Sequence, residues 1–212
     1  MTKLFFFLLL LGHISFGQTT IRGITTISTD GISSDSLNKS PNLVFNDRIK
    51  LIQIDKSSAT VDIRLYRLHS LSNTKTLRRL FMIDTTWNAV EYNEWNKPIK
   101  IKKYNLIANQ SFDSLFLNLL SYGILTLPSQ SELEHKMYKE ELVEDDGQIV
   151  TAKRRLHVLD GKVYIIEIKV GDKFRVYQFD NPDQYSKFYD NVSEFKGYLH
   201  IVRAFNTMLR RK

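Results

Sequence analysis

Apolar and polar side chains alternate with a period of two through the middle of the chain. Val61, Ile63 and Leu65 are apolar, and the residues between them, Asp62 and Arg64, are charged. A period of two places successive side chains on opposite faces of a strand. The alternation predicts antiparallel strands at residues 61–66, 77–83, 87–95 and 99–102, the last at a sheet edge because the preceding proline cannot donate to a ladder.

After residue 110 the apolar period becomes that of a helix. Phe112, Phe116 and Leu119 fall on one helical face. Ser111 is a candidate N-cap, and Gly123 ends the apolar run. The pattern predicts a short amphipathic helix.

A longer apolar stripe runs from Phe188 to Leu209 and predicts a single long C-terminal helix. Phenylalanines on the stripe and Gly197 in its middle fit poorly with a coiled-coil seam. We therefore expect this helix to pack across a sheet and to bury Phe195 and Leu199. Together, the patterns predict an α+β fold: antiparallel sheet or sheets, with a short amphipathic helix and a long C-terminal helix packed on them.

Three more strands are expected, at residues 156–159, 163–170 and 174–179. Gly171-Asp172, between the last two, suits a two-residue type II′ turn, which would mix polar and apolar side chains on both faces. A three-residue loop over residues 171–173 would instead give one apolar and one polar face. Because burying a charge costs more than an imperfect turn, we expect the three-residue loop.

The three-residue loop would gather the richest polar set of the chain on one face of the hairpin. These candidate site residues are Glu167, Lys169, Arg175 and Tyr177. One interpretation is a cross-strand salt bridge on a solvated face. The other is a hydrolytic site on a polyanion, with a carboxylate as base and one of the histidines at positions 69, 135, 157 and 200 as acid.

The distribution of predicted strands and helices along the chain suggests two modules. Residues 43–107 are rich in strands, residues 111–212 follow a helix–strands–helix order, and a boundary is expected near residues 108–110. A flexible N-terminal arm is expected over residues 18–42, with one edge strand at residues 20–27. The acidic segment 129–150 is consistent with either a helical turn or a long strand.

The N-terminus has the three parts of a secretory signal peptide. Lys3 precedes an apolar run, and small residues at Ser15 and Gly17 predict cleavage before Gln18. We therefore expect residues 1–17 to be removed and the mature chain to be a soluble periplasmic or secreted protein without a transmembrane span.

Composition and motifs exclude several chemistries. The chain has no cysteine, which excludes disulfides, thiolate metal sites and a cysteine nucleophile. It also lacks a glycine-rich phosphate loop, a His-Glu-x-x-His motif and a Gly-x-Ser-x-Gly motif. No cofactor or metal site is therefore predicted, and no catalytic residue is assigned. The net charge of +7 predicts attraction to anions, but the sequence does not interleave basic residues with aromatics in the way that predicts a nucleic-acid partner.

Residues 112–205 resemble an uncharacterised family of secreted proteins from Gram-negative bacteria that has no assigned activity. The chain has Tyr164 where that pattern has a tryptophan. The resemblance implies a helix–strands–helix module and transfers no catalytic residue. It rests on Leu127-Pro128, Leu159-Asp160-Gly161, the residues from Tyr164 to Glu167, Tyr177 and Asn181-Pro182, between two helices.

These observations favour an exported, non-catalytic binding or interaction domain. Its expected partner is another protein or a component of the cell envelope. The alternative is a secreted, nuclease-like hydrolase acting on a polyanionic substrate, which the basic charge and the hairpin set support. The oligomeric state is left open.

Overall fold

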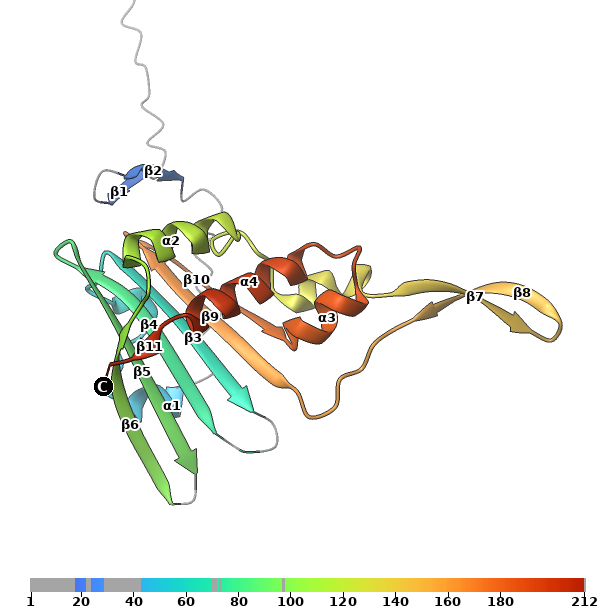
Figure 1. Cartoon of the computed structure of the whole chain (residues 1–212), viewed down its shortest axis with the longest axis horizontal. Coiled ribbons are helices and arrows are strands. Elements are labelled where there is room, and N and C mark those ends of the chain that lie inside the picture. The colour runs from blue at the N-terminus through green and yellow to red at the C-terminus, as the bar shows by residue number, and fades with distance from the viewer. Residues whose placement is uncertain are drawn as a thin grey trace, which may run out of the picture.

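The computed structural model describes residues 18–21, 24–28, 43–69, 72, 74–96 and 98–211. Its main feature is a seven-stranded antiparallel sheet (Figure 1) with the order β10-β9-β3-β4-β5-β6-β11. The predicted signal peptide lies outside the described residues. The strands of this sheet are β3 (Val61–His69), β4 (Lys75–Ile83), β5 (Thr86–Asn96), β6 (Ile99–Ile107), β9 (Lys162–Val170), β10 (Lys173–Asp180) and β11 (Leu209–Arg210).

The strands predicted from the period of two are confirmed. Asp84 and Thr85 both have positive φ, at 46° and 65°, in the two-residue connection between β4 and β5. This is the geometry of a type I′ hairpin turn. β6 pairs with β11 at Leu106 and Ile107, so its first residues lie at the sheet edge, as Pro98 predicts.

Three helices cover one face of the sheet (Figure 1): α2 (Phe112–Ser121), α3 (Pro182–Phe188) and α4 (Glu194–Asn206). Ser111 caps α2 as predicted, because its hydroxyl accepts a hydrogen bond from the Ser114 amide at 3.1 Å. α4 packs on the sheet and buries Phe195 and Leu199. The predicted α+β class is therefore confirmed.

The prediction of one long C-terminal helix is wrong, because the chain leaves the helical path between α3 and α4. Tyr189 ends α3 with ψ at 72°, and its hydroxyl accepts a hydrogen bond from the Leu156 amide. Asp190, Asn191 and Ser193 follow, and such residues compete with the helix through local side-chain hydrogen bonds. Leu209, the last residue of the predicted stripe, lies in β11 instead.

The opposite face of the sheet is also covered, by α1 (Leu43–Arg48) and the 3₁₀ helix η1 (Ile54–Lys56). Phe45 and Ile54 from these elements pack on Tyr66, Leu77 and Ile165 in a second apolar cluster. Strand β3 is consequently buried on both faces over its first six residues. The charged side chains of its alternating pattern therefore point into protein rather than into solvent.

One sheet unites the two predicted modules. β3 precedes the expected boundary at residues 108–110, β9 follows it, and the two strands pair with Ile63 opposite Ile168. Apolar residues from both sides of the boundary also share one core cluster. The division into a module of residues 43–107 and a module of residues 111–212 is therefore wrong.

Two small hairpins lie outside this sheet: β1 (Gln18–Ile21) with β2 (Ile24–Ser28), and β7 (Lys139–Asp145) with β8 (Gln148–Arg154). The single strand expected near residues 20–27 is thus two strands. Both alternatives for segment 129–150 occur, since the 3₁₀ helix η2 (Gln130–Lys136) precedes β7. The strand expected at residues 156–159 does not form, and this stretch connects β8 to β9 as an irregular segment.

Candidate functional site

The β9–β10 hairpin has the two-residue turn, so the predicted three-residue loop is wrong. Val170 pairs with Lys173 and Ile168 pairs with Arg175. Gly171 has a φ of 62°, as the first central residue of a type II′ turn requires. The four candidate residues therefore do not share a face. Glu167 and Lys169 lie on the α1 side of the sheet, and Arg175 and Tyr177 lie on the α4 side.

Glu167 is buried because a cation lies opposite it on the next strand. Arg64 on β3 donates from Nη1 to Glu167 Oε2 at 3.1 Å, and neither side chain is exposed. Tyr66 donates its hydroxyl to the same oxygen at 3.1 Å. Pairing of this kind offsets the cost of burying a charge. The three-residue loop would avoid burying an unpaired charge, but Glu167 is paired, and its partner comes from a strand far away in sequence.

A second carboxylate, Asp62, extends this pair into a buried ion cluster of Asp62, Arg64, Arg79 and Glu167. Asp62 Oδ2 accepts from Arg64 Nη2 at 2.9 Å and from Arg79 Nη2 at 2.7 Å. Burial alone would raise the pKa of Asp62, but the hydrogen bonds and charges of Arg79 and Arg64 outweigh it and hold that pKa below its usual value.

The buried ion cluster fastens the irregular segment around η1 to the sheet. Arg64 Nη1 also donates to the Ile52 carbonyl at 2.9 Å, and Ser57 donates its hydroxyl to Asp62 at 2.6 Å. The predicted site residue Lys169 donates to the Ser57 carbonyl. These contacts use most of the hydrogen-bonding groups of the cluster to hold the fold together, although Glu167 Oε1 is buried without a hydrogen bond among the described residues.

On the α4 side of the sheet, Arg175 and Tyr177 also donate hydrogen bonds to backbone carbonyls. Arg175 Nη1 donates to the Leu125 carbonyl at 3.1 Å, and the Tyr177 hydroxyl donates to the Ile124 carbonyl at 3.1 Å. Burial raises the pKa of Tyr177, so its hydroxyl stays a donor. The two side chains tie the segment after α2 to β10. The geometry does not bring the four candidates together as a catalytic set.

The feature that sequence reasoning missed is the β7–β8 hairpin, residues 139–154, called the arm below. It projects away from the seven-stranded sheet (Figure 1) and pairs with no other described strand. Leu142 and Ile149 are each 76% exposed. They lie diagonally opposite on one face, while Val143 and Val150 pair directly on the other. The arm therefore presents apolar side chains on both faces.

A sequence signal for the arm was present at its tip. Asp146 and Gly147 have φ values of 48° and 75°, as in a type I′ turn, and an Asp-Gly pair between apolar residues is the usual sign of this turn. The surrounding charge obscured the pattern. The arm contains five carboxylates and three cations, with the carboxylates of Glu144, Asp145 and Asp146 gathered at the tip.

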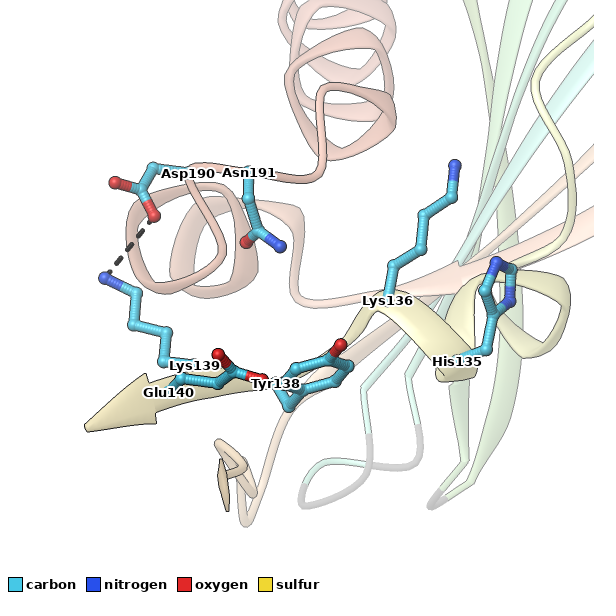
Figure 2. A pocket seen from close by; sticks show the side chains of 7 residues that line it. All are labelled: His135, Lys136, Tyr138, Lys139, Glu140, Asp190 and Asn191. Atoms are coloured by element: carbon cyan, nitrogen blue, oxygen red, sulfur yellow. Dashed lines mark ion pairs between the residues drawn. The ribbon is translucent and has the colours of Figure 1, made fainter. Parts of the chain in front are cut away.

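A polar pocket of about 700 Å³ lies at the base of the arm (Figure 2). Lys139 and Asp190 form an ion pair at 3.5 Å across one side of it, and Lys136 pairs with Glu194 at 2.9 Å. The Lys139 ammonium also lies 5.3 Å from the centre of the Phe188 ring. These contacts attach the base of the arm to α3 and α4. The pocket is lined by His135, Lys136, Tyr138, Lys139, Glu140, Asp190 and Asn191.

Comparisons with protein-family models, with curated proteins and with solved structures find no match to this chain. Among the described residues, no three histidine or acidic side chains are grouped so that they could hold a metal ion. In the same part of the chain, no helix combines the length and apolar character needed to cross a membrane.

Proposed function

We propose that this protein is an exported, non-catalytic binding protein that holds a protein partner through the arm. The observation that carries the proposal is the exposure of Leu142 and Ile149 on a projecting two-stranded hairpin. The signal-peptide pattern of residues 1–17 supports export to the periplasm or beyond.

The arm adds little stability to the free protein, whereas a bound partner would bury its apolar surface. An isolated two-stranded hairpin is marginally stable in water. A partner that covers the arm would gain about 25 cal/mol for each Å² of apolar surface removed from water. Both outer edges of the hairpin also offer backbone donors and acceptors to an added strand.

Charge narrows the kind of partner. Strand β7 carries four carboxylates and one cation, Lys139. The carboxylates are those of Glu140, Glu141, Glu144 and Asp145. Like charges on adjacent strands repel, and opposite charges attract. The partner segment that fits β7 is therefore extended, partly apolar and basic. The polar pocket at the base of the arm supports the proposal by offering paired charges and hydrogen-bonding groups to one polar side chain of that segment.

Site-specific photocrosslinking in the producing cell tests this proposal. A photoreactive phenylalanine analogue would replace Leu142 on the arm or, as the control, Leu117, which is exposed on α2. We expect an adduct from position 142 that is absent from position 117 and is lost when Ile149→Asp is added. Equal adducts from both positions, or none from position 142, would overturn the proposal. An adduct of twice the chain mass would show that the partner is a second copy of this chain and not another protein.

A further inference from the structure

Part of the α4-side face of the sheet is left uncovered by the described helices (Figure 1). α4 crosses the sheet, and the strand ends beyond it, toward the start of β6, have no helix in front of them. The uncovered part, called the open face, has the exposed side chains of Trp95, Lys100 and Lys102. Arg67 and His69 on the same face are half-buried, and Thr76 and Asn93, between Arg67 and Lys102, are buried.

The side chains of the open face form two rows across neighbouring strands. Arg67, Thr76, Asn93 and Lys102 follow one another in register from β3 to β6. Farther from α4, Trp95 pairs with Lys100. Adjacent strands are about 4.8 Å apart, and same-face neighbours along a strand are about 6.7 Å apart. Lys100 and Lys102 are therefore about 6.7 Å apart along β6, and Arg67 lies three strands, about 14 Å, from Lys102, distances that an extended polyanion can span.

Positive charge dominates this surface. Glu91, which lies on the same face, is buried and pairs with Arg78 at 2.7 Å and with Arg210 at 2.6 Å. Burial, and then the charges of Arg67 and Lys162, lower the pKa of His69. The negative charge of Asp183 on α3 contributes to raising the pKa of Tyr164. Tyr164 pairs with Arg67 on the side of β3 that is away from β6. Within the described part of the chain, the buried Nε of Arg67 makes no hydrogen bond.

Aromatic rings hold two cations in place. The Lys102 ammonium lies 5.9 Å from the Trp95 ring centre, and the Arg210 guanidinium lies 4.1 Å from the Tyr104 ring centre. Cation–π contacts of this kind restrict a flexible side chain. They also occupy the ring faces on which nucleobases would stack. The arrangement thus favours a polyanion that binds through its charges without stacking bases on these rings.

We infer that the open face binds an extended anionic polysaccharide, with its sulfate or carboxylate groups on Lys100, Lys102 and Arg67. This site is separate from the arm and does not depend on the proposed function. The polymer would cross the strands beside Trp95. Its affinity would fall as salt rises, because charge pairing at an exposed surface is screened.

Heparin is the probe, measured by calorimetry and tryptophan fluorescence on the full chain. We expect the double variant K100Q/K102Q to raise the dissociation constant about tenfold or more, since two charge contacts are lost. The matched control is K56Q/K103Q, which removes the same charge from exposed lysines on the α1 side, and it should change the constant less than about threefold. Trp95 is 39% exposed whereas Trp87 is buried, so W95F should abolish the fluorescence change.

Three outcomes would overturn the inference. Equal losses in the two lysine variants would show attraction to net charge rather than to the open face. Tighter binding of single-stranded DNA than of heparin at matched charge and salt would assign the face to nucleic acid. Full binding by K100Q/K102Q would place the ligand elsewhere. The arm variant L142S/I149S should bind heparin like the wild type, so a failure here and a failure of the proposed function are distinguishable.

Discussion

Arg64 on β3 and Glu167 on β9 lie directly opposite each other and form an ion pair of 3.1 Å that no solvent reaches. The pair sits between the sheet and the segment that contains α1 and η1. Arg64 contacts both the sheet and that segment. The two residues thereby determine how the α1 face of the sheet is closed.

Removing Glu167 should destabilise the fold strongly. Glu167→Ala leaves the buried Arg64 with one carboxylate, and breaking a buried pair costs about 3–5 kcal/mol. The measurement is the free energy of unfolding in urea. The control is Glu141→Ala, whose partner Arg154 is 64% exposed, and which should cost less than about 1 kcal/mol. A loss below about 1 kcal/mol for Glu167→Ala would contradict the structural role of the pair.

Stability should fall in acid through Asp62. Its pKa in the folded protein lies below the unfolded value of about 3.9, so the ionised carboxylate stabilises the fold above about pH 4. That contribution is lost as the pH falls through the folded pKa. Urea unfolding measured from neutral pH into this acid range should show a steeper decline for the wild type than for Asp62→Asn. Parallel curves for the two proteins would argue against the prediction.

Phe195 should be a large contributor to the core. Its buried ring lies 5.3 Å from that of Tyr185 and 5.7 Å from that of Tyr198. Phe195→Ala should cost about 3–5 kcal/mol in denaturant unfolding, because the aromatic cluster cannot collapse fully around the cavity. The control is Leu117→Ala on the exposed side of α2. Similar losses for the two variants would show that α4 is not a core helix.

Replacing Gly197 in α4 by alanine should destabilise the protein, although alanine is the better helix former. Alanine stabilises a helix interior by about 1 kcal/mol relative to glycine. A Cβ at Gly197 would, however, lie 3.0 Å from the Tyr122 carbonyl oxygen and 3.0 Å from a Leu127 methyl carbon. We therefore expect Gly197→Ala to lower the midpoint of urea unfolding. A raised midpoint would mean that the segment after α2 moves aside at little cost.

Local patterns predicted those elements whose surroundings are local. The Ser111 cap, the strands β3 to β5 and the exposed start of β6 follow from residues close together in sequence. The break between α3 and α4 did not follow, because the apolar stripe continues across it. Val192, in the break, is buried as fully as Phe195 in the helix, so the period of the stripe is kept while the backbone changes.

The candidate site failed for a long-range reason. Burying Glu167 would be costly if the charge had no partner, so the pattern of polar and apolar residues predicts the wrong hairpin register. The partner, Arg64, is 103 residues away along the chain. No local pattern in the sequence reveals that β3 is covered on both faces over its first six residues, and this coverage is why Asp62 and Arg64 are buried.

The position of β3 between β4 and β9 also has a consequence for the order of folding. β4 follows β3 directly in the sequence, whereas β9 is synthesised only after most of the chain. Until β9 arrives, β3 has an open edge, and the cations Arg64 and Arg79 have only Asp62 in the cluster. Non-local pairing of this kind has a high contact order and slows folding. A chain released before residue 170 would expose a strand edge that favours aggregation over completion of the sheet.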